Sequence, residues 1–277
     1  IDRDLGLHPG WDHLNFFRFL GRLDRLNAAR PAAERVRLHI TDIPIEWEEM
    51  TAEGYANLWE SVVPDRDPLM ADLITEQFRA LDDGGASAKA LVIMNYRHAF
   101  NDFSFDDGSR GNNVGRYLFE RFPGRVANVM LHSLAWIPDA TGREPTYEPI
   151  QKGRWDAAFR LAGVEEAGFD FADSPFGRDT FDYFSFRPHS VAYQDVFTGF
   201  VFYRPLAEHY FMSGIPGMFD DGFEEEYRRR LSLTGREFDE EDVETALAAS
   251  ASPIRETYDE PERLEAMIGD WLDDASK

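Results

Sequence analysis

The spacing of apolar residues predicts several amphipathic helices. Apolar residues recur at three-residue steps between Leu14 and Leu26, which is typical of a helix with one apolar face. The stretch RDPLMADLITEQFRALDDGG, residues 66–85, predicts the clearest helix of the chain. There Asp67 can cap the helix, Pro68 fits its first turn and two glycines end it. The same pattern predicts further helices at 48–63, at 112–122 with Asn112 or Asn113 as cap, and in acidic segments after residue 219.

Short apolar runs between these helices predict strands. Residues 36–42 alternate apolar and polar side chains, and KALVIMN (89–95) and the run at 126–132 are more uniformly apolar. An order of strand, helices, strand, helix, strand indicates a parallel sheet that is covered on both faces. We therefore expect an α/β fold with a mainly parallel central sheet flanked by helices, in which these three runs are neighbouring parallel strands. Apolar segments near residues 168–171 and 197–203 are expected to extend the sheet.

A change of composition near Phe219 divides the chain. We expect residues 1–215 to form the α/β domain and residues 216–277 to form an acidic helical extension. Apolar side chains such as Phe223 and Leu264 give this extension a side that can pack on the core. Its runs of charge are interpreted as solvated helix faces.

Composition narrows the classes of function. The chain has 277 residues, a net charge of -23 and no cysteine. The negative charge argues against nucleic acid and anionic membranes as partners, and the lack of cysteine excludes disulfides and thiolate chemistry. No apolar run approaches the roughly 18 residues of a membrane span, and no signal pattern opens the chain. We expect a soluble protein, cytoplasmic rather than exported, that is processed or trimmed at its start and acts on a small molecule or peptide. Its oligomeric state is left open.

Polar residues follow the predicted strands where an α/β sheet binds ligands. Ligands bind outside the carboxyl ends of the strands in such sheets. Asp42 ends the first run, and Asn95, Arg97 and His98 follow the second, with Asp102 shortly after. His132 and His189 are interpreted as structural. The chain has no GxSxG, P-loop or GxGxxG motif, which argues against a serine-triad hydrolase and a nucleotide-binding enzyme.

Residues 66–100 resemble the superfamily of the erythromycin esterases, the ChaN haem-uptake lipoproteins and the Tiki proteases. Arg66, Asp67, Met70 and Ala71 match that superfamily's RDxxMA helix, and His98 matches the histidine after the next strand. The resemblance covers about residues 36–134 and weakens toward residue 205. Two features differ. Asn95 stands where erythromycin esterases have a second histidine, and no GExxH motif stands in residues 1–35, so it lies upstream of Ile1 or is lacking.

The resemblance implies hydrolysis of an ester or amide and names no substrate; nothing in the sequence requires a cofactor or metal. His98 would be the general base, since a free imidazole has a pKa of about 6.5. Arg66 or Arg97 would hold a carboxylate or a developing oxyanion, and Asp42 or Asp102 would orient the imidazole. The polar residues expected to contact the substrate are Asn95, Arg97 and Asp67.

Two alternatives remain open from the sequence. The same pocket could bind haem or a divalent metal, with Tyr96 and His98 as ligands, as the resemblance to ChaN implies. The chain could also be an inactive scaffold that uses its acidic C-terminal helices to bind partners.

Overall fold

The structure is a computed structural model that describes residues 13–82, 88–101, 104, 108, 110–137, 146–183, 191–219, 222–234, 240–258 and 260–275. Two compact units divide the chain. Unit 1 comprises Ile1–Arg66 and Tyr210–Thr257, and unit 2 comprises Asp67–His209 and Tyr258–Lys277. This division differs from the predicted boundary near residue 215, because the helices after that residue are shared between the two units.

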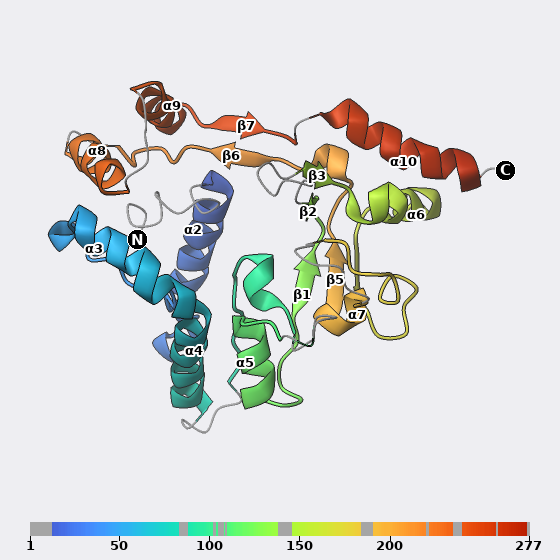
Figure 1. Cartoon of the computed structure of the whole chain (residues 1–277), viewed down its shortest axis with the longest axis horizontal. Coiled ribbons are helices and arrows are strands. Elements are labelled where there is room, and N and C mark those ends of the chain that lie inside the picture. Colours follow the sequence, from blue (N-terminus) through green and yellow to red (C-terminus); the bar gives the residue numbers. More distant parts are fainter. Residues whose placement is uncertain are drawn as a thin grey trace. The chain divides into compact units, whose positions relative to one another are not determined.

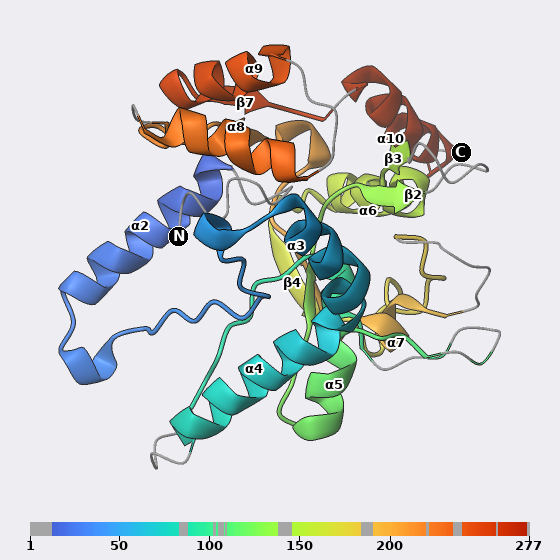
Figure 2. The ribbon, with the colours of Figure 1, turned by 60° about the vertical axis from the view of Figure 1, so that its left-hand side comes forward.

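Unit 1 is mostly helical, with one small antiparallel sheet. Strands β6 and β7 pair with each other, and α8 and α9 lie beside them in Figures 1 and 2. Ile215, Met218 and Phe223 form a small core, and Phe17 packs against it. Its elements are α2 (Leu14–Ala28), η1 (Ala32–Glu34), η2 (Trp47–Glu49), α3 (Ala52–Asn57), the π-helical turn η3 (Leu58–Val62), η4 (Val63–Asp65), β6 (Phe211–Ser213), α8 (Phe223–Leu233), α9 (Glu240–Ala251) and β7 (Ile254–Glu256).

Unit 2 contains a three-stranded mixed sheet in the order β1-β5-β4. Strand β1 runs parallel to β5, and β4 runs antiparallel to β5. A separate antiparallel pair joins β2 to β3. Its elements are α4 (Arg66–Asp82, which starts at the unit boundary), η5 (Tyr96–Ala99), α5 (Val114–Arg121), β1 (Val129–Leu131), β2 (Ala135–Ile137), β3 (Thr146–Glu148), η6 (Ile150–Gly153), α6 (Arg154–Ala162), β4 (Ala167–Asp170), α7 (Tyr193–Val196), β5 (Gly199–Phe202), η7 (Leu206–Glu208) and α10 (Pro261–Ala275).

The chain is thus a mixed α/β protein with small mixed and antiparallel sheets. The apolar runs near 129, 168 and 200 form strands as the sequence predicts. The runs at 36–42 and 89–95 form no strand, and most of their apolar side chains are exposed, with Leu38 54% and Leu91 81% accessible. Alternation or apolarity shows that a segment suits a sheet, but a strand also needs a neighbour that accepts its backbone hydrogen bonds.

Aromatic side chains dominate the core of unit 2. Trp155, Phe171, Tyr193 and Phe200 are almost fully buried and contact one another as ring pairs. The Trp155 indole N–H donates to Asp179 Oδ2 at 2.7 Å, so its only polar atom has a partner. This cluster supports the loops that follow the strands of the small sheet.

Helix α10 packs against α6 within unit 2, beside it in Figures 1 and 2. Leu264 and Ile268 are the buried residues of α10. Gly153, which precedes α6 with φ 89°, lies so close that a Cβ there would stand 3.0 Å from the Ile268 side chain. The contact therefore requires glycine both for its backbone angle and for its lack of a side chain.

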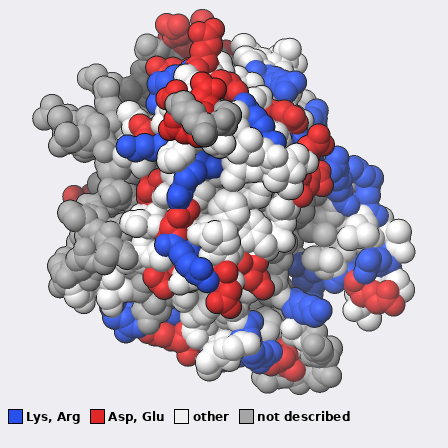
Figure 3. Space-filling view, turned by 90° about the vertical axis from the view of Figure 1, so that its right-hand side faces the viewer, with Lys and Arg blue, Asp and Glu red and all other residues white. Residues whose placement is uncertain are grey.

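Acidic and basic side chains are interspersed on the face drawn in Figure 3. Ion pairs such as Arg160–Glu265 and Arg125–Asp82 join neighbouring elements of unit 2. Among the helices in the described ranges, none is both long enough and apolar enough to cross a membrane.

Candidate functional site

A histidine–aspartate pair in unit 2 joins two of the residues that the sequence singles out. His98 Nδ1 lies 2.6 Å from Asp67 Oδ1. Both side chains are nearly buried, with 11% and 13% of their surfaces accessible. Asp67 stands in the first turn of α4, where a helix favours an acidic residue, and His98 stands in η5. Residues thirty-one positions apart thus meet in one hydrogen bond.

The partner of Nδ1 fixes the tautomer of the neutral imidazole. An ionised carboxylate only accepts hydrogen bonds, so His98 Nδ1 carries the hydrogen and donates it to Asp67. In the neutral ring, Nε2 then keeps its lone pair. No residue of the described ranges hydrogen-bonds Nε2, and this atom is not sealed from solvent. The pair therefore has the geometry of a base whose orientation is set by a carboxylate.

Local structure explains where the imidazole stands. The Asn95 side chain accepts a hydrogen bond from the Arg97 N–H and caps η5, and the His98 N–H donates to the Asn95 carbonyl at 3.0 Å. Tyr96 and Phe100, on either side, pack into the aromatic core. Tyr96 contacts Tyr183 edge to face at 4.8 Å. The turn is thus anchored at both ends, and His98 lies between the anchors.

Asn128, just before β1, ties the same turn to the sheet. Its side-chain amide donates to the carbonyls of Ala99 and Val196 at 2.6 and 2.9 Å. Its side-chain oxygen accepts from the Thr198 N–H at 2.9 Å. The amide of Asn101 also donates to the Val196 carbonyl. One buried side chain therefore connects the turn that carries His98 to the loop that leads into β5.

Helix α5 approaches the same turn at Gly115. A Cβ at this position would stand 2.3 Å from the Phe100 carbonyl oxygen and 2.6 Å from that of Ala99. Asn113 begins α5 by accepting the Arg116 N–H, which confirms one of the two predicted caps. Helices α4 and α5 lie side by side in Figures 1 and 2 and share a small core that includes Ala71. The two helices thus hold the histidine and its carboxylate in place.

Replacing Gly115 by alanine is therefore expected to lower the free energy of unfolding by about 2 kcal/mol, because a methyl group must displace backbone carbonyls. Urea unfolding followed by circular dichroism measures the change. The matched control is Gly269→Ala in α10, where no atom lies within 4 Å of the added Cβ. There alanine is expected to be neutral or stabilising, since it favours helix. Equal effects of the two substitutions would contradict the tight approach at Gly115.

The other predicted site residues have different partners. Arg66 donates through Nε to Asp42 Oδ1 at 2.8 Å and through Nη2 to Asp42 Oδ2. The carboxylate beside His98 is thus Asp67, for which the sequence predicted a helix cap and a substrate contact. Helix α4 begins one residue earlier, at Arg66, so Asp67 lies inside the helix and is not its cap. Asp42 pairs with Arg66 in unit 1. Asn95 acts as a cap, and the Arg97 side chain is exposed with no partner among the described residues. Asp102 lies outside the described residues.

Tyr96 and His98 were the ligands considered for haem or a metal, and the environment of Tyr96 does not favour that role. Tyr96 is half-buried against the aromatic core, and burial raises the pKa of its phenol well above the usual value. Within the described parts of the chain, no group of three or more histidine, aspartate, glutamate or cysteine side chains could hold a metal ion.

A second histidine cluster, fully inside unit 2, was only partly predicted. His132 is fully buried, with Nε2 3.2 Å from Asp156 Oδ2 and its ring 5.2 Å from that of His209. His209 Nε2 lies 3.0 Å from the Arg204 carbonyl, and its ring stacks on Tyr203. The sequence indicated a structural role for His132 but not its partner Asp156. The available signal was an acidic residue between Trp155 and Ala157 on the buried side of α6.

Comparisons with protein families, with characterised proteins and with solved structures find no match to this chain. Its function must therefore be argued from the geometry of the site.

Proposed function

We propose that the protein is a hydrolase in which His98 is the general base and Asp67 orients it. The observation that carries this proposal is the 2.6 Å hydrogen bond between His98 Nδ1 and Asp67 Oδ1, with Nε2 bonded to none of the described residues. A histidine held only for packing would donate to a backbone carbonyl and seal both nitrogens. The resemblance of residues 66–100 to the erythromycin esterase, ChaN and Tiki superfamily points to the same histidine.

The proposed reaction is the attack of water on an ester or amide carbonyl. His98 Nε2 takes a proton from the water as the oxygen bonds to the carbonyl carbon, and the same nitrogen then returns the proton to the leaving group. The Asp67 carboxylate stabilises the imidazolium that forms between these steps. Arg97, adjacent to His98 and exposed, can approach the negative charge that develops on the carbonyl oxygen. Asn95, in the same turn as His98, remains a candidate for contact with the substrate.

The direct test is turnover of a panel of chromogenic esters and amides by the purified chain, with product formation followed over time. Hydrolysis of at least one substrate above the rate in buffer supports the proposal, provided that the rate scales with protein concentration. A chain that hydrolyses none of them, and that shows a Soret band on addition of haem, would favour the binding alternative. The geometry favours hydrolysis, because the raised pKa of Tyr96 opposes the phenolate form that binds iron.

The superfamily resemblance also implies a mainly parallel sheet in which residues 89–95 form a strand. The parallel pairing of β1 with β5 supports such a sheet, and the run at 89–95 is mostly apolar. Hydrogen–deuterium exchange tests this part of the proposal. If residues 89–95 pair with a strand as the resemblance implies, the amides of residues 90–94 exchange as slowly as those of β1, since strand pairing removes them from water. If these amides exchange at the rate of an unstructured peptide, residues 89–95 are not a strand and the sheet has only β1, β5 and β4.

A further inference from the structure

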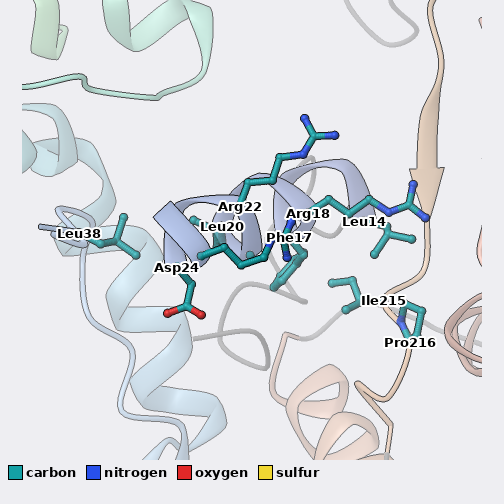
Figure 4. Close-up of a pocket in the computed structure, with 11 residues that line it drawn as sticks. Leu14, Phe17, Arg18, Leu20, Arg22, Asp24, Leu38, Ile215 and Pro216 are labelled. Atoms are coloured by element: carbon teal, nitrogen blue, oxygen red, sulfur yellow. The ribbon is translucent and has the colours of Figure 1, made fainter. Parts of the chain in front are cut away.

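Unit 1 carries a groove that combines apolar and cationic side chains. Its volume is about 830 Å³, within the range of small-molecule sites, and most of its wall is helix α2. Leu14, Phe17 and Ile215 supply apolar surface. Figure 4 shows Phe17 facing Ile215, with the Arg18 side chain extending toward Leu14. Arg22 and Arg25 complete a row of three guanidinium groups in the wall, with Asp24 as the acidic residue among them.

The apolar residues of α2 that line this groove are only half covered. None of the fifteen residues of α2 is buried, although its sequence is amphipathic. Leu14, Phe17 and Leu20, which line the groove, are half-buried. Helices of globular proteins gain most of their stability by burying an apolar face. An occupant that covers this face would therefore add stability that the rest of unit 1 does not provide.

The three arginines of the groove have no partner among the described residues, although the chain carries 52 acidic residues. Other arginines are paired, for example Arg66 with Asp42 and Arg263 with Glu260. Arg18, Arg22 and Arg25 stand four and three positions apart, so their charges share one helix face. Like charges at this spacing destabilise a helix, and a bound anion would remove that cost.

Gly21 opens space in the middle of the wall. It is the residue of the groove without a side chain, and a Cβ added there would meet only Arg25 Nη1, at 3.7 Å. The Arg25 side chain thus leans back over Gly21. From Leu14 to Arg25 the wall is about 16 Å long, from the rise of an α-helix. This length suits an extended alkyl chain better than a compact ligand.

We infer that the groove binds a single long-chain carboxylate, with its head group on the arginines and its alkyl chain along Leu14, Phe17 and Ile215. The net charge of -23 opposes approach to an anionic surface as a whole, so a monomeric amphiphile fits better than a membrane. This site is independent of the histidine–aspartate pair of unit 2.

Titration calorimetry with dodecanoate, kept below the concentration at which it forms micelles, tests the inference. Saturable one-to-one binding is expected. Dodecanol, which keeps the chain but lacks the charge, and acetate, which keeps the charge but lacks the chain, are each expected to bind at least about tenfold more weakly. Binding to anionic vesicles without binding of monomeric dodecanoate would overturn the inference, as would equal affinity for dodecanol.

Variants distinguish binding in the groove from a general effect of the protein's charge on dodecanoate. The double substitution Arg18→Gln with Arg22→Gln is expected to weaken dodecanoate binding about tenfold or more. The matched control, Arg30→Gln with Arg37→Gln, removes the same charge from exposed residues outside the groove and is expected to leave affinity unchanged. Gly21→Leu keeps every charge but fills the wall and is also expected to weaken binding. Equal losses in the control pair, or full affinity in Gly21→Leu, would overturn the inference.

Discussion

Replacing His98 by glutamine is expected to lower kcat/KM for a cleavable ester by about a thousandfold, within the usual contribution of a general base. Glutamine keeps much of the size and polarity of histidine but cannot take a proton at neutral pH. His98→Ala is expected to lose as much activity. If the histidine were structural instead, the alanine variant would lose about 1–3 kcal/mol of unfolding free energy through unpaired partners, with activity intact. Steady-state kinetics and urea unfolding of both variants distinguish these outcomes.

Asp67→Asn tests the same pair from its other side. An asparagine amide can donate to Nδ1, which would place the ring hydrogen on Nε2 and remove the base. We expect kcat/KM to fall about a thousandfold or more while the fold is retained. His39→Gln is the matched control, since His39 is an exposed histidine without a hydrogen bond to any described residue. Equal activity of Asp67→Asn and the wild type would exclude the orienting role.

Lowering the pH from 6.5 to 4 is expected to reduce the free energy of unfolding by about 3 kcal/mol through the protonation of His209 alone. Burial lowers the pKa of His209 from 6.5 to about 4, and only 4% of this residue is accessible. Because its pKa is lower in the folded chain than in the unfolded chain, the unfolded chain binds the proton first. The contribution of His209 to the free energy of unfolding is thus fully present above pH 6.5 and is lost as the pH falls from 6.5 to 4.

Comparison with His209→Gln isolates this contribution from the titration of carboxylates. The charged or titratable groups that act on or contact His209 are His132, Asp156, Arg204, Tyr203 and Tyr258, and the variant leaves all five in place. Urea unfolding at a series of pH values is expected to show the wild type losing about 3 kcal/mol more than the variant between pH 6.5 and pH 4. Parallel pH curves for the two proteins would show that His209 is not the group responsible.

Local signals in the sequence predict the helices and their ends well. Asn113 caps its helix as expected, because a side-chain oxygen beside a free N–H acts over only a few residues. The strands near residues 129, 168 and 200 were also predicted. The run at 88–95 shows the limit of such signals, since apolar residues cannot indicate whether a partner strand lies alongside.

The candidate site was predicted in its residues but not in its pairing. His98 and Asp67 were both singled out, yet Asp42 or Asp102 was expected to orient the ring. A choice among carboxylates depends on how α4 packs beside the turn at 96–99, which no local pattern encodes. The hydrogen bond from His132 to Asp156 escaped prediction for the same reason, because the two residues belong to different elements.

The division of the chain has a consequence for its synthesis. Unit 1 needs both Ile1–Arg66 and Tyr210–Thr257, and unit 2 needs both Asp67–His209 and the final segment from Tyr258. Neither unit is contiguous in the sequence. When the ribosome has translated as far as residue 209, each unit still lacks its second segment. Nascent chains commonly fold domain by domain from the amino end, but here the last helix, α10, must arrive before unit 2 is whole. Each core therefore stays incomplete during synthesis until its second segment has been made.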